Sequence, residues 1–392
     1  MRYPEKRPPA FTLTAGPVDA YPEVLRAMGT TVLYDYDPAF QAQYETIALK
    51  AQKAMGMNIP PVILHGEPVL GLEAAAASLI AKDDVVLNLA SGVYGKGFGY
   101  WAARYAARVD EIEVPYDDCI DPDAVRAHLK SHPETAVVAV CHHDTPSGTL
   151  NDINAIGEVV AASGALLIVD AVSSWAGMKT SPDACQAGIY VTGPNKCLGC
   201  PPGLTLAAVS DGAWEKMETN PDAPFASMLS YTDWKDAWRA TEPFPFTPSV
   251  AEINGLGAAL DRYLEEGPET VWARHALTAA ATRDGVRTMG LDIWPVREKI
   301  ASPTCTAVRM PDGIDAGPII AEARARYGVS LSAGRADTLG KLIRIGHMGP
   351  TAQPMFAHVA VAALGGALAS KGVKVDIGAG LAAVQARIDA SH

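Results

Sequence analysis

The sequence has little of what membrane-embedded, secreted or nucleic-acid-binding proteins depend on. No stretch approaches the roughly 18 uninterrupted apolar residues that a membrane-spanning helix needs. The N-terminus, MRYPEKRPPAF, lacks the apolar segment of a secretory signal peptide. Basic residues are in the minority: 32 Lys and Arg stand against 44 Asp and Glu, for a formal net charge of −12. This balance argues against nucleic acid as a partner. We therefore expect a cytoplasmic protein that acts on small molecules, without a membrane or a nucleic acid.

Cysteine is also scarce. Six cysteines scattered over 392 residues do not form the dense framework of a disulfide-stapled protein. Cys197 and Cys200 have the spacing of a redox motif, but two prolines follow and no second pair appears, which argues against a redox or zinc site. His142-His143-Asp144 offers metal-binding side chains, but neighbouring residues of a strand point to opposite faces and no third ligand supports them. We expect no bound metal.

Apolar residues, in contrast, make up 48% of the chain. This length and composition predict two domains and a large packed core. Between about residues 60 and 210, short apolar runs alternate with helical patterns. Strands are expected at 84–90, 136–141, 166–170, 189–192 and 204–209, and helices at about 69–81, 97–107, 121–131 and 151–163. Buried strands that alternate with helices predict an α/β fold with a mainly parallel central sheet.

The rest of the chain is expected to be arranged around this sheet. We expect an N-terminal arm at 1–20, a large α/β domain at 21–250 and a smaller C-terminal α+β domain at 251–392. Segment 243–249 is rich in proline and aromatics and suits an ordered connector, and helices are expected at 250–266, 356–370 and 379–392. Ligands of open α/β sheets bind at the carboxyl ends of the strands, so polar residues there are the candidates for a site.

Two charged residues follow strands of the predicted sheet. Asp170 closes the run LLIVD, and a buried carboxylate needs a partner because an unpaired buried charge is costly. Taken alone, a helix cap or an ion pair would explain it. Lys196 follows IYVTGPN and is the only charged residue in 188–210. Apolar surroundings lower the pKa of a lysine and make it a nucleophile or base near neutral pH, and they disfavour the alternative of a surface lysine.

Further polar side chains occur near other strand ends. Tyr94 stands between glycines in SGVYG, where it is placed to stack on a flat ligand or to pack in the core. The nearby glycines do not match G-x-G-x-x-G, so no dinucleotide site is expected. Thr145, in DTPSG, offers a hydroxyl. Arg335 and Arg344 lie in glycine-bounded segments of the C-terminal part, and arginine is the side chain best suited to bidentate carboxylate recognition.

Together these side chains suit pyridine-aldehyde chemistry. An acid can hold a protonated ring nitrogen so that the ring accepts electrons, and a lysine can form a Schiff base and move the proton. The chain resembles the class V aminotransferases of fold type I, the group with alanine–glyoxylate and serine–pyruvate enzymes. The resemblance is carried, in family order, by LTAGPV (13–18), SGVYG (91–95), HHDTPSG (142–148), LLIVDAVSS (166–174), YVTGPNKCLGCPPG (190–203) and RIGHMG (344–349).

This resemblance implies roles for the candidate residues. Lys196 would be the Schiff-base lysine, Asp170 the partner of the ring nitrogen, and Tyr94 the stacking residue. Thr145 would lie near the ring hydroxyl, and Arg344, together with Arg335, would clamp the substrate carboxylate. A homodimer or homotetramer with shared active sites is also implied. Roles near the site stay open for Tyr34, Phe246 and His347.

The chain departs from the family in the stretch HGEPVLGLEAAAASL, residues 65–79. A glycine turn before a helix commonly holds a phosphate on free backbone N–H groups, but here Glu67 occupies the loop. Two unit charges at ~4 Å repel by about 4 kcal/mol at an effective dielectric of ~20. A hydroxyl would instead donate a hydrogen bond of about 1.5–3 kcal/mol to the carboxylate. The plain alternative is a charge that stabilises the helix dipole by ~0.3–1 kcal/mol. A second departure is Phe244, near a position where the family often has a tyrosine.

With the rest of the site in place, Glu67 favours a pyridine ring that lacks its phosphate. HGEPVLGLEAAAASL and SAGRADTLGKLIRIGHMGPTAQP also resemble a vitamin-B6-degrading branch of the family more than its general members. The resemblance implies transfer of the amino group of free pyridoxamine to pyruvate, giving pyridoxal and L-alanine. No tightly bound cofactor is then expected, because pyridoxal and pyridoxamine act as substrates.

Three alternatives remain at this point. An ordinary aminotransferase for alanine, serine or glyoxylate would keep pyridoxal phosphate as its cofactor, with Glu67 pointing away. A lyase or desulfurase built on the same fold would need a cysteine on a mobile loop, and Cys305 is the only candidate in the C-terminal half. A non-catalytic B6 carrier would have no need of the proton shuttle that Lys196 offers.

Overall fold

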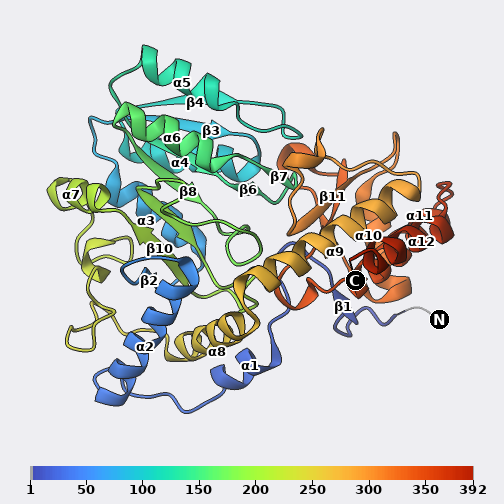
Figure 1. Ribbon diagram of the computed structural model, residues 1–392, viewed down its shortest axis with the longest axis horizontal. Coiled ribbons are helices and arrows are strands. Elements are labelled where there is room, and N and C mark those ends of the chain that lie inside the picture. Colours follow the sequence, from blue (N-terminus) through green and yellow to red (C-terminus); the bar gives the residue numbers. More distant parts are fainter. Residues whose placement is uncertain (1–2, 392) are drawn as a thin grey trace.

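The computed structural model describes residues 3–391. The first two residues of the predicted arm and the last residue of the predicted C-terminal helix lie outside this range. A seven-stranded sheet lies inside its larger part, beside the C-terminal helices (Figure 1). The strand order is β2-β10-β9-β8-β5-β3-β4. These strands are β2 (Val62–Leu64), β3 (Val85–Ala90), β4 (Arg108–Glu113), β5 (Thr135–Cys141), β8 (Leu166–Asp170), β9 (Ile189–Thr192) and β10 (Thr205–Val209). All neighbours from β4 to β9 pair in parallel, while β10 is antiparallel to β9 and β2. The predicted mainly parallel sheet is confirmed.

Two strands of this sheet were missed by the sequence prediction. β2 is only three residues long. β4 reads RVDEIE and lies at the sheet edge, where its side chains are exposed or half-buried. An edge strand carries charges that hide the apolar pattern, and such charges also protect the free edge from pairing with other chains.

Within residues 3–391, eight helices lie in the part of the chain that contains the central sheet. They are α1 (Pro22–Met28), α2 (Pro38–Met55), α3 (Pro68–Leu79), α4 (Val93–Tyr105), α5 (Pro122–Ser131), α6 (Ile153–Ser163), α7 (Asp211–Thr219) and α8 (Val250–Glu266). Aspartates at the N-caps of α2, α5 and α6 accept hydrogen bonds from the first turns, which satisfies donors that have no partner inside the helix. Segment 243–249 has no regular structure, as expected for a connector.

The C-terminal part contains a smaller antiparallel sheet of β11 (Cys305–Arg309), β14 (Leu342–Gly346) and β13 (Ser332–Ala333), in that order. Its helices are α9 (Pro268–Thr288), α10 (Ala316–Tyr327), α11 (Met355–Ser370) and α12 (Ile377–Asp389). Short 3₁₀ helices lie at Thr232–Trp234, Glu298–Ile300, Ala336–Thr338 and Gly349–Thr351, and β6 (His143–Asp144) pairs with β7 (Thr149–Leu150).

The N-terminal arm joins this smaller part. β1 (Phe11–Thr12) pairs in parallel with β12 (Val329–Ser330), and Leu13 packs in the apolar cluster of the C-terminal helices. The arm therefore brings residues 13–18 from the C-terminal part back toward the central sheet.

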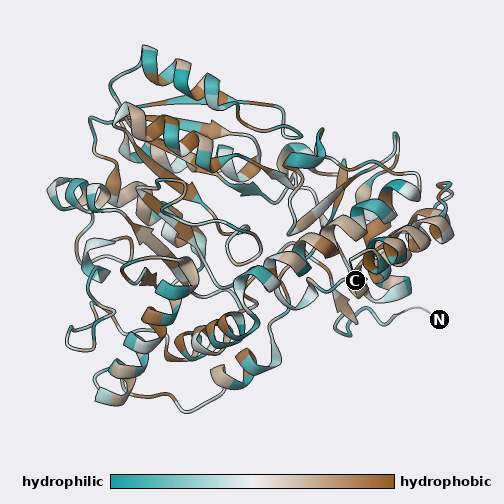
Figure 2. Ribbon diagram, in the orientation of Figure 1, coloured by the Kyte–Doolittle hydropathy of each residue, from teal (hydrophilic) through white to brown (hydrophobic). Residues whose placement is uncertain are grey.

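Buried apolar side chains form two clusters. The larger one contains the central sheet and reaches Val271 in the first part of α9, whereas Ala281 in the same helix belongs to the smaller cluster. Figure 2 shows apolar strands inside the large domain and hydrophilic residues on outer helices such as α5. The long helix α9 thus contributes to both cores, and the domain boundary at 250/251 stays a prediction.

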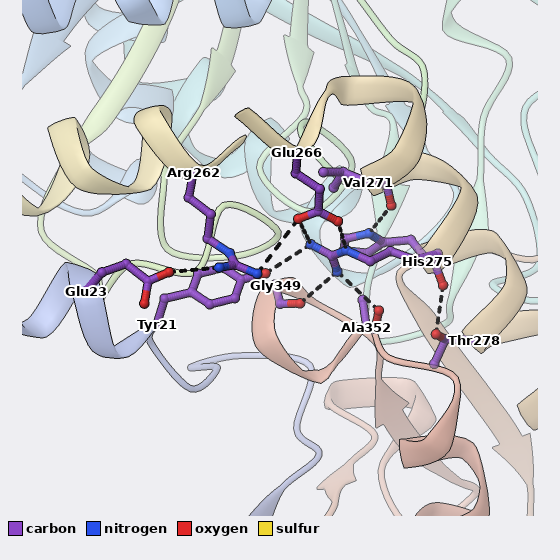
Figure 3. A network of polar contacts seen from close by, with 10 residues as sticks. Tyr21, Glu23, Arg262, Glu266, Val271, His275, Thr278, Gly349 and Ala352 are labelled. Atoms are coloured by element: carbon purple, nitrogen blue, oxygen red, sulfur yellow. Dashed lines mark hydrogen bonds and ion pairs between the residues drawn. The ribbon is translucent and has the colours of Figure 1, made fainter. Parts of the chain in front are cut away.

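A polar network stabilises the junction where α8 ends and α9 begins (Figure 3). Arg274 is paired with Glu266 at 2.5 Å and donates to the carbonyl oxygens of Gly349 and Ala352 at 3.0 and 3.1 Å. It also donates to the Tyr21 hydroxyl at 3.0 Å. Because these partners come from the residue before α1, the end of α8 and the segment after β14, the network holds the two parts of the molecule together.

Candidate active site

Lys196 lies in the turn after β9, in a segment without other charged side chains. Its Nζ donates a hydrogen bond to the carbonyl oxygen of Ala15 at 3.0 Å. Burial lowers the pKa of Lys196, and the positive charge of Arg344 lowers it further. Gly16 has φ of +123°, and a Cβ on it would lie 1.8 Å from Nζ, so the close approach of the arm requires glycine. Lys196 is therefore not a surface lysine.

Asp170 closes β8, beside Cys141 of β5 in the parallel register. Its Oδ1 accepts the backbone N–H of Val172 at 3.0 Å, and the Cys141 thiol donates to Oδ2 at 3.6 Å. Burial raises the pKa of Asp170 to about 6, against the lowering effect of these donors and of Lys196. Asp170 makes no ion pair within residues 3–391 and caps no helix. Its carboxylate keeps acceptor capacity for a ligand N–H.

The segment SGVYG differs from its expected conformation. Instead of a loop before a helix at 97, it forms the start of α4, which begins at Val93 and places Tyr94 in the first turn. Glycine is a poor helix former, so the sequence pattern alone argued against a helix here. The carboxylate of Asp144 overrides this preference, because its Oδ2 accepts the backbone N–H groups of Tyr94 and Gly95 at 2.7 and 3.0 Å.

Asp144 is the residue that the sequence prediction missed at the site. It was considered only as a weak metal ligand in HHDTPSG. Its side chain is fully buried, and burial raises its pKa to about 6. The neighbouring Thr145 is also fully buried, and its Oγ1 has no hydrogen-bond partner among the described residues. A buried hydroxyl without a partner is costly, so Thr145 fits a ligand that brings a polar group of its own.

Glu67 occupies the N-cap position of α3 and is exposed. Its side chain accepts no hydrogen bond from the first turn of the helix. Its negative charge acts on the pKa values of both Asp170 and Lys196, so it lies on the side of the helix that faces these two residues. The carboxylate is thus close to the candidate site and makes no capping hydrogen bond to the helix.

Arg344 lies in the small sheet, and Arg335 lies in the loop between its strands β13 and β14, just before the 3₁₀ helix Ala336–Thr338. Arg344 in β14 is opposite Ser332 of β13, is 6% exposed, and donates from Nε to the carbonyl oxygen of Ala333 at 2.8 Å. It has no carboxylate partner in the part of the chain that the structure describes. Arg335 is exposed. The charges of both arginines act on the pKa of Tyr94, so the small sheet brings them toward the large domain.

The other residues noted in the sequence lie in varied surroundings. Tyr34 is 68% exposed, Phe246 packs partly buried on the large cluster, and His347 is buried with its Nε2 2.9 Å from the Thr306 hydroxyl. Phe244 is buried against Tyr44, with ring centroids 4.9 Å apart, which makes it a core residue in this chain. Of these four residues, only His347 is buried next to a polar side chain.

Three expectations from the sequence concern a reactive cysteine, a metal site and a membrane span. Cys305 lies buried in β11, where burial raises the pKa of its thiol to about 11. A desulfurase cysteine would have to be a reactive thiolate on a mobile loop, so this alternative loses its candidate. Across residues 3–391 no group of three or more His, Cys, Asp or Glu side chains is arranged to hold a metal ion. No helix in the same range has the length and apolar character needed to cross a bilayer.

A buried lysine in a turn, a buried carboxylate at the end of β8 and arginines from the C-terminal part of the chain are the side chains that an aminotransferase site requires. The model of the aminotransferase class-V family matches residues 76–361, and the chain belongs to this family. It is 68% identical to a protein of Mesorhizobium japonicum named pyridoxamine–pyruvate transaminase, with 100% of this chain and 99% of that protein covered.

Solved structures agree with this assignment. The crystal structure of pyridoxamine–pyruvate aminotransferase from Mesorhizobium loti superimposes with a TM-score of 0.99 at 67% identity, covering 100% of both chains. The ureidoglycine–glyoxylate aminotransferase of Bacillus subtilis superimposes with a TM-score of 0.92 at 26% identity, covering 98% of this chain and 100% of that one. The predicted fold type I architecture is confirmed.

Proposed function

We propose that this enzyme transfers the amino group of free pyridoxamine to pyruvate and releases pyridoxal and L-alanine, as a step of vitamin B6 degradation. The observation that carries the proposal is Glu67, a carboxylate at the helix start where phosphate would otherwise bind. The near-full-length similarity to a pyridoxamine–pyruvate transaminase supports it. Pyridoxamine is then a substrate that enters and leaves, and no cofactor stays bound between turnovers.

Each side chain of the site has a task in this reaction. Asp170 accepts the N–H of the ring nitrogen and keeps the ring protonated, so that it withdraws electrons. Tyr94 stacks on the ring, and the unpartnered hydroxyl of Thr145 bonds the ring hydroxyl. Glu67 accepts a hydrogen bond from the 5′-hydroxyl, which is the group that distinguishes pyridoxamine from its phosphate.

Lys196 is the general acid–base catalyst in this proposal. Burial lowers the pKa of Lys196, which favours the unprotonated amine that a base requires. After amine and ketone have condensed with loss of water, Lys196 takes a proton from C4′ of the pyridine substrate. It returns this proton to the α-carbon derived from pyruvate, and addition of water to the resulting imine releases pyridoxal and L-alanine. In the reverse direction its amine forms a Schiff base with pyridoxal.

Arg344, together with Arg335, binds the carboxylate of pyruvate. A buried guanidinium without a carboxylate partner is costly, and the substrate carboxylate supplies that partner. The geometry of Arg344 suits this role because Nε is fixed on Ala333, while its terminal nitrogens have no partner within residues 3–391 and can form a bidentate pair.

We also propose that the enzyme is a cytoplasmic homodimer or homotetramer. The segment that follows α1 exposes Val32, Tyr34 and Tyr36 at 71%, 68% and 55%. Neighbouring exposed apolar side chains of this kind are typical of an interface between subunits. Sedimentation of the purified protein tests this point, and a monomer at micromolar concentration would contradict it.

An assay of extensively desalted protein tests the proposed reaction. The enzyme receives pyruvate with either free pyridoxamine or pyridoxamine phosphate, and alanine and pyridoxal are measured. We expect turnover with the free amine. A yellow protein that retains pyridoxal phosphate through desalting and transaminates amino acids would instead identify an ordinary member of the family with a resident cofactor.

A further inference from the structure

Asp144 makes a contact that joins two distant parts of the large domain. It lies in β6, yet its Oδ2 accepts hydrogen bonds from the backbone N–H groups of Tyr94 and Gly95, 50 and 49 residues earlier. The side chain is fully buried, and Oδ1 has no partner among the described residues. A buried carboxylate that accepts two helix N–H groups forms charge-assisted hydrogen bonds and also meets the positive end of the helix dipole.

The backbone of Asp144 is itself held firmly. Its carbonyl oxygen accepts the N–H groups of Ser147 and Gly148 at 3.1 and 2.8 Å, and also the Ser147 hydroxyl at 3.1 Å. Asp144 pairs with Thr149 in the β6–β7 hairpin. The carboxylate therefore approaches α4 from a fixed position, and it is the helix start that adapts to it.

Gly92 makes room for this approach. A Cβ on Gly92 would lie 2.2 Å from Cγ of Asp144. Its φ of 175° is extended backbone that any residue adopts, so the requirement for glycine comes from the carboxylate and not from the conformation. Gly92 and Asp144 are thus two halves of one contact.

The start of α4 has little intrinsic tendency to be helical. Glycines at 95, 97 and 99 lie in its first two turns, and each is unfavourable in a helix relative to alanine. The direction of the Tyr94 side chain depends on whether its residue adopts helical backbone angles. The contact with Asp144 therefore decides where the aromatic ring points.

We propose that Asp144 is a positioning residue, which orients the ring of Tyr94 for stacking on the pyridine substrate by fixing the first turn of α4. This inference rests on the proposed function, because Tyr94 is assigned as the stacking residue there. Asp144 acts through Tyr94 and needs no contact with substrate.

Hydrogen exchange of the ligand-free protein tests the structural half of the proposal. The variants are Asp144→Asn, Asp144→Ala and Gly92→Ala, which approaches the contact from the other side. Asp376→Asn is the control, since Asp376 also accepts a backbone N–H from the first turn of a helix, that of Ala379 in α12, but does so as the exposed N-cap residue of that helix. We expect faster exchange at the amides of Tyr94 and Gly95 in all three variants, least in Asp144→Asn because its amide oxygen still accepts. Unchanged protection in Gly92→Ala and Asp144→Asn would overturn the proposal.

Binding of pyridoxal, followed by the absorbance of its adduct with Lys196, tests the functional half. We expect the Kd of pyridoxal to rise at least about tenfold in Gly92→Ala and Asp144→Ala, the scale of one charged hydrogen bond. The rise should be smaller in Asp144→Asn and absent in Asp376→Asn. The KM of pyruvate should change less than the KM of pyridoxamine. Wild-type affinity together with lost amide protection would refute the positioning role.

A failure of the proposed function gives a different result. In that case the wild-type enzyme binds pyridoxal phosphate in preference to pyridoxal. The same four variants are then compared with pyridoxal phosphate as the probe, and the expected order of affinities is unchanged. Asp144 is thus tested whichever vitamer the enzyme uses.

Discussion

Replacing Glu67 by glutamine should shift the enzyme from pyridoxamine toward pyridoxamine phosphate. The change removes one negative charge and keeps the shape of the side chain. Glu67 lies at the N-cap of α3, accepts no hydrogen bond from that helix and has no ion-pair partner in residues 3–391. Its charge is therefore not neutralised by the protein, and a phosphate at this helix start would experience it directly.

The size of the effect follows from the exposure of Glu67. Two unit charges at ~4 Å interact by ~1 kcal/mol in water and ~4 kcal/mol at an effective dielectric of ~20. Because Glu67 is exposed, the low end of this range, about 1–2 kcal/mol per pair of unit charges, applies. A phosphate with roughly 1.5 to 2 charges is then repelled by about 1.5–4 kcal/mol, or roughly tenfold to a thousandfold in affinity. Replacing a charged acceptor by a neutral one weakens the bond to the 5′-hydroxyl by about 1 kcal/mol, roughly fivefold.

The assay is kcat/KM for each vitamer with pyruvate as the acceptor. We expect Glu67→Gln to raise kcat/KM at least about tenfold for pyridoxamine phosphate and to lower it about fivefold for pyridoxamine. Glu73→Gln is the control, since it removes the same charge from the same helix, where Glu73 pairs with Arg104 at 2.9 Å. An unchanged ratio of the two vitamers in Glu67→Gln would refute the reasoning.

Three further predictions concern Lys196, Asp170 and the polar network between α8 and α9. Lys196→Ala should abolish turnover and the absorbance of the pyridoxal adduct, and near-normal turnover would reject its role as catalyst. Asp170→Asn should lose pyridoxal binding yet be more stable than the ligand-free wild type above pH 6, by up to ~3 kcal/mol for a pKa raised from the usual ~3.9 to about 6. The buried carboxyl must ionise as the pH rises from about 4 to 6, so the stability difference in urea unfolding should vanish below pH 4, and a less stable variant at pH 8 would contradict this. Arg274→Met removes the nearer ion-pair partner of Glu266, leaving only Arg262 at 3.9 Å, and should destabilise by about 3 kcal/mol, seen as a lower Tm. Arg387→Met, at an exposed pair with Asp284, should change Tm little.

The periodic elements could be predicted from the sequence because the physics that forms them is local. The strands at 166–170 and 189–192 and the helix at 250–266 match the structure residue for residue. Each is a continuous apolar run or a clear helical pattern. The charged edge strand β4 could not be recognised in this way, since edge position is a property of the sheet and not of the segment.

The start of α4 was misplaced for a related reason. Helix propensity in SGVYGKGFG is low, and the group that stabilises the first turn lies 50 residues away in Asp144. Propensity is a weak guide when a tertiary contact supplies the cap. The residue types of the site could be recognised from the sequence, but the contacts that hold them in place could not.

The sequence by itself determined the chemistry available to this protein: a lysine without neighbouring charge, an acid at the end of a buried strand, arginines for a carboxylate, and Glu67 at a helix start. The tertiary structure alone decided how these groups are held. Ala15 meets Lys196 across 181 residues, and Cys141 reaches Asp170 through the parallel register of β5 and β8. Such contacts depend on which strands become neighbours and on which side chains lose water together, and neither is encoded within a short segment of chain.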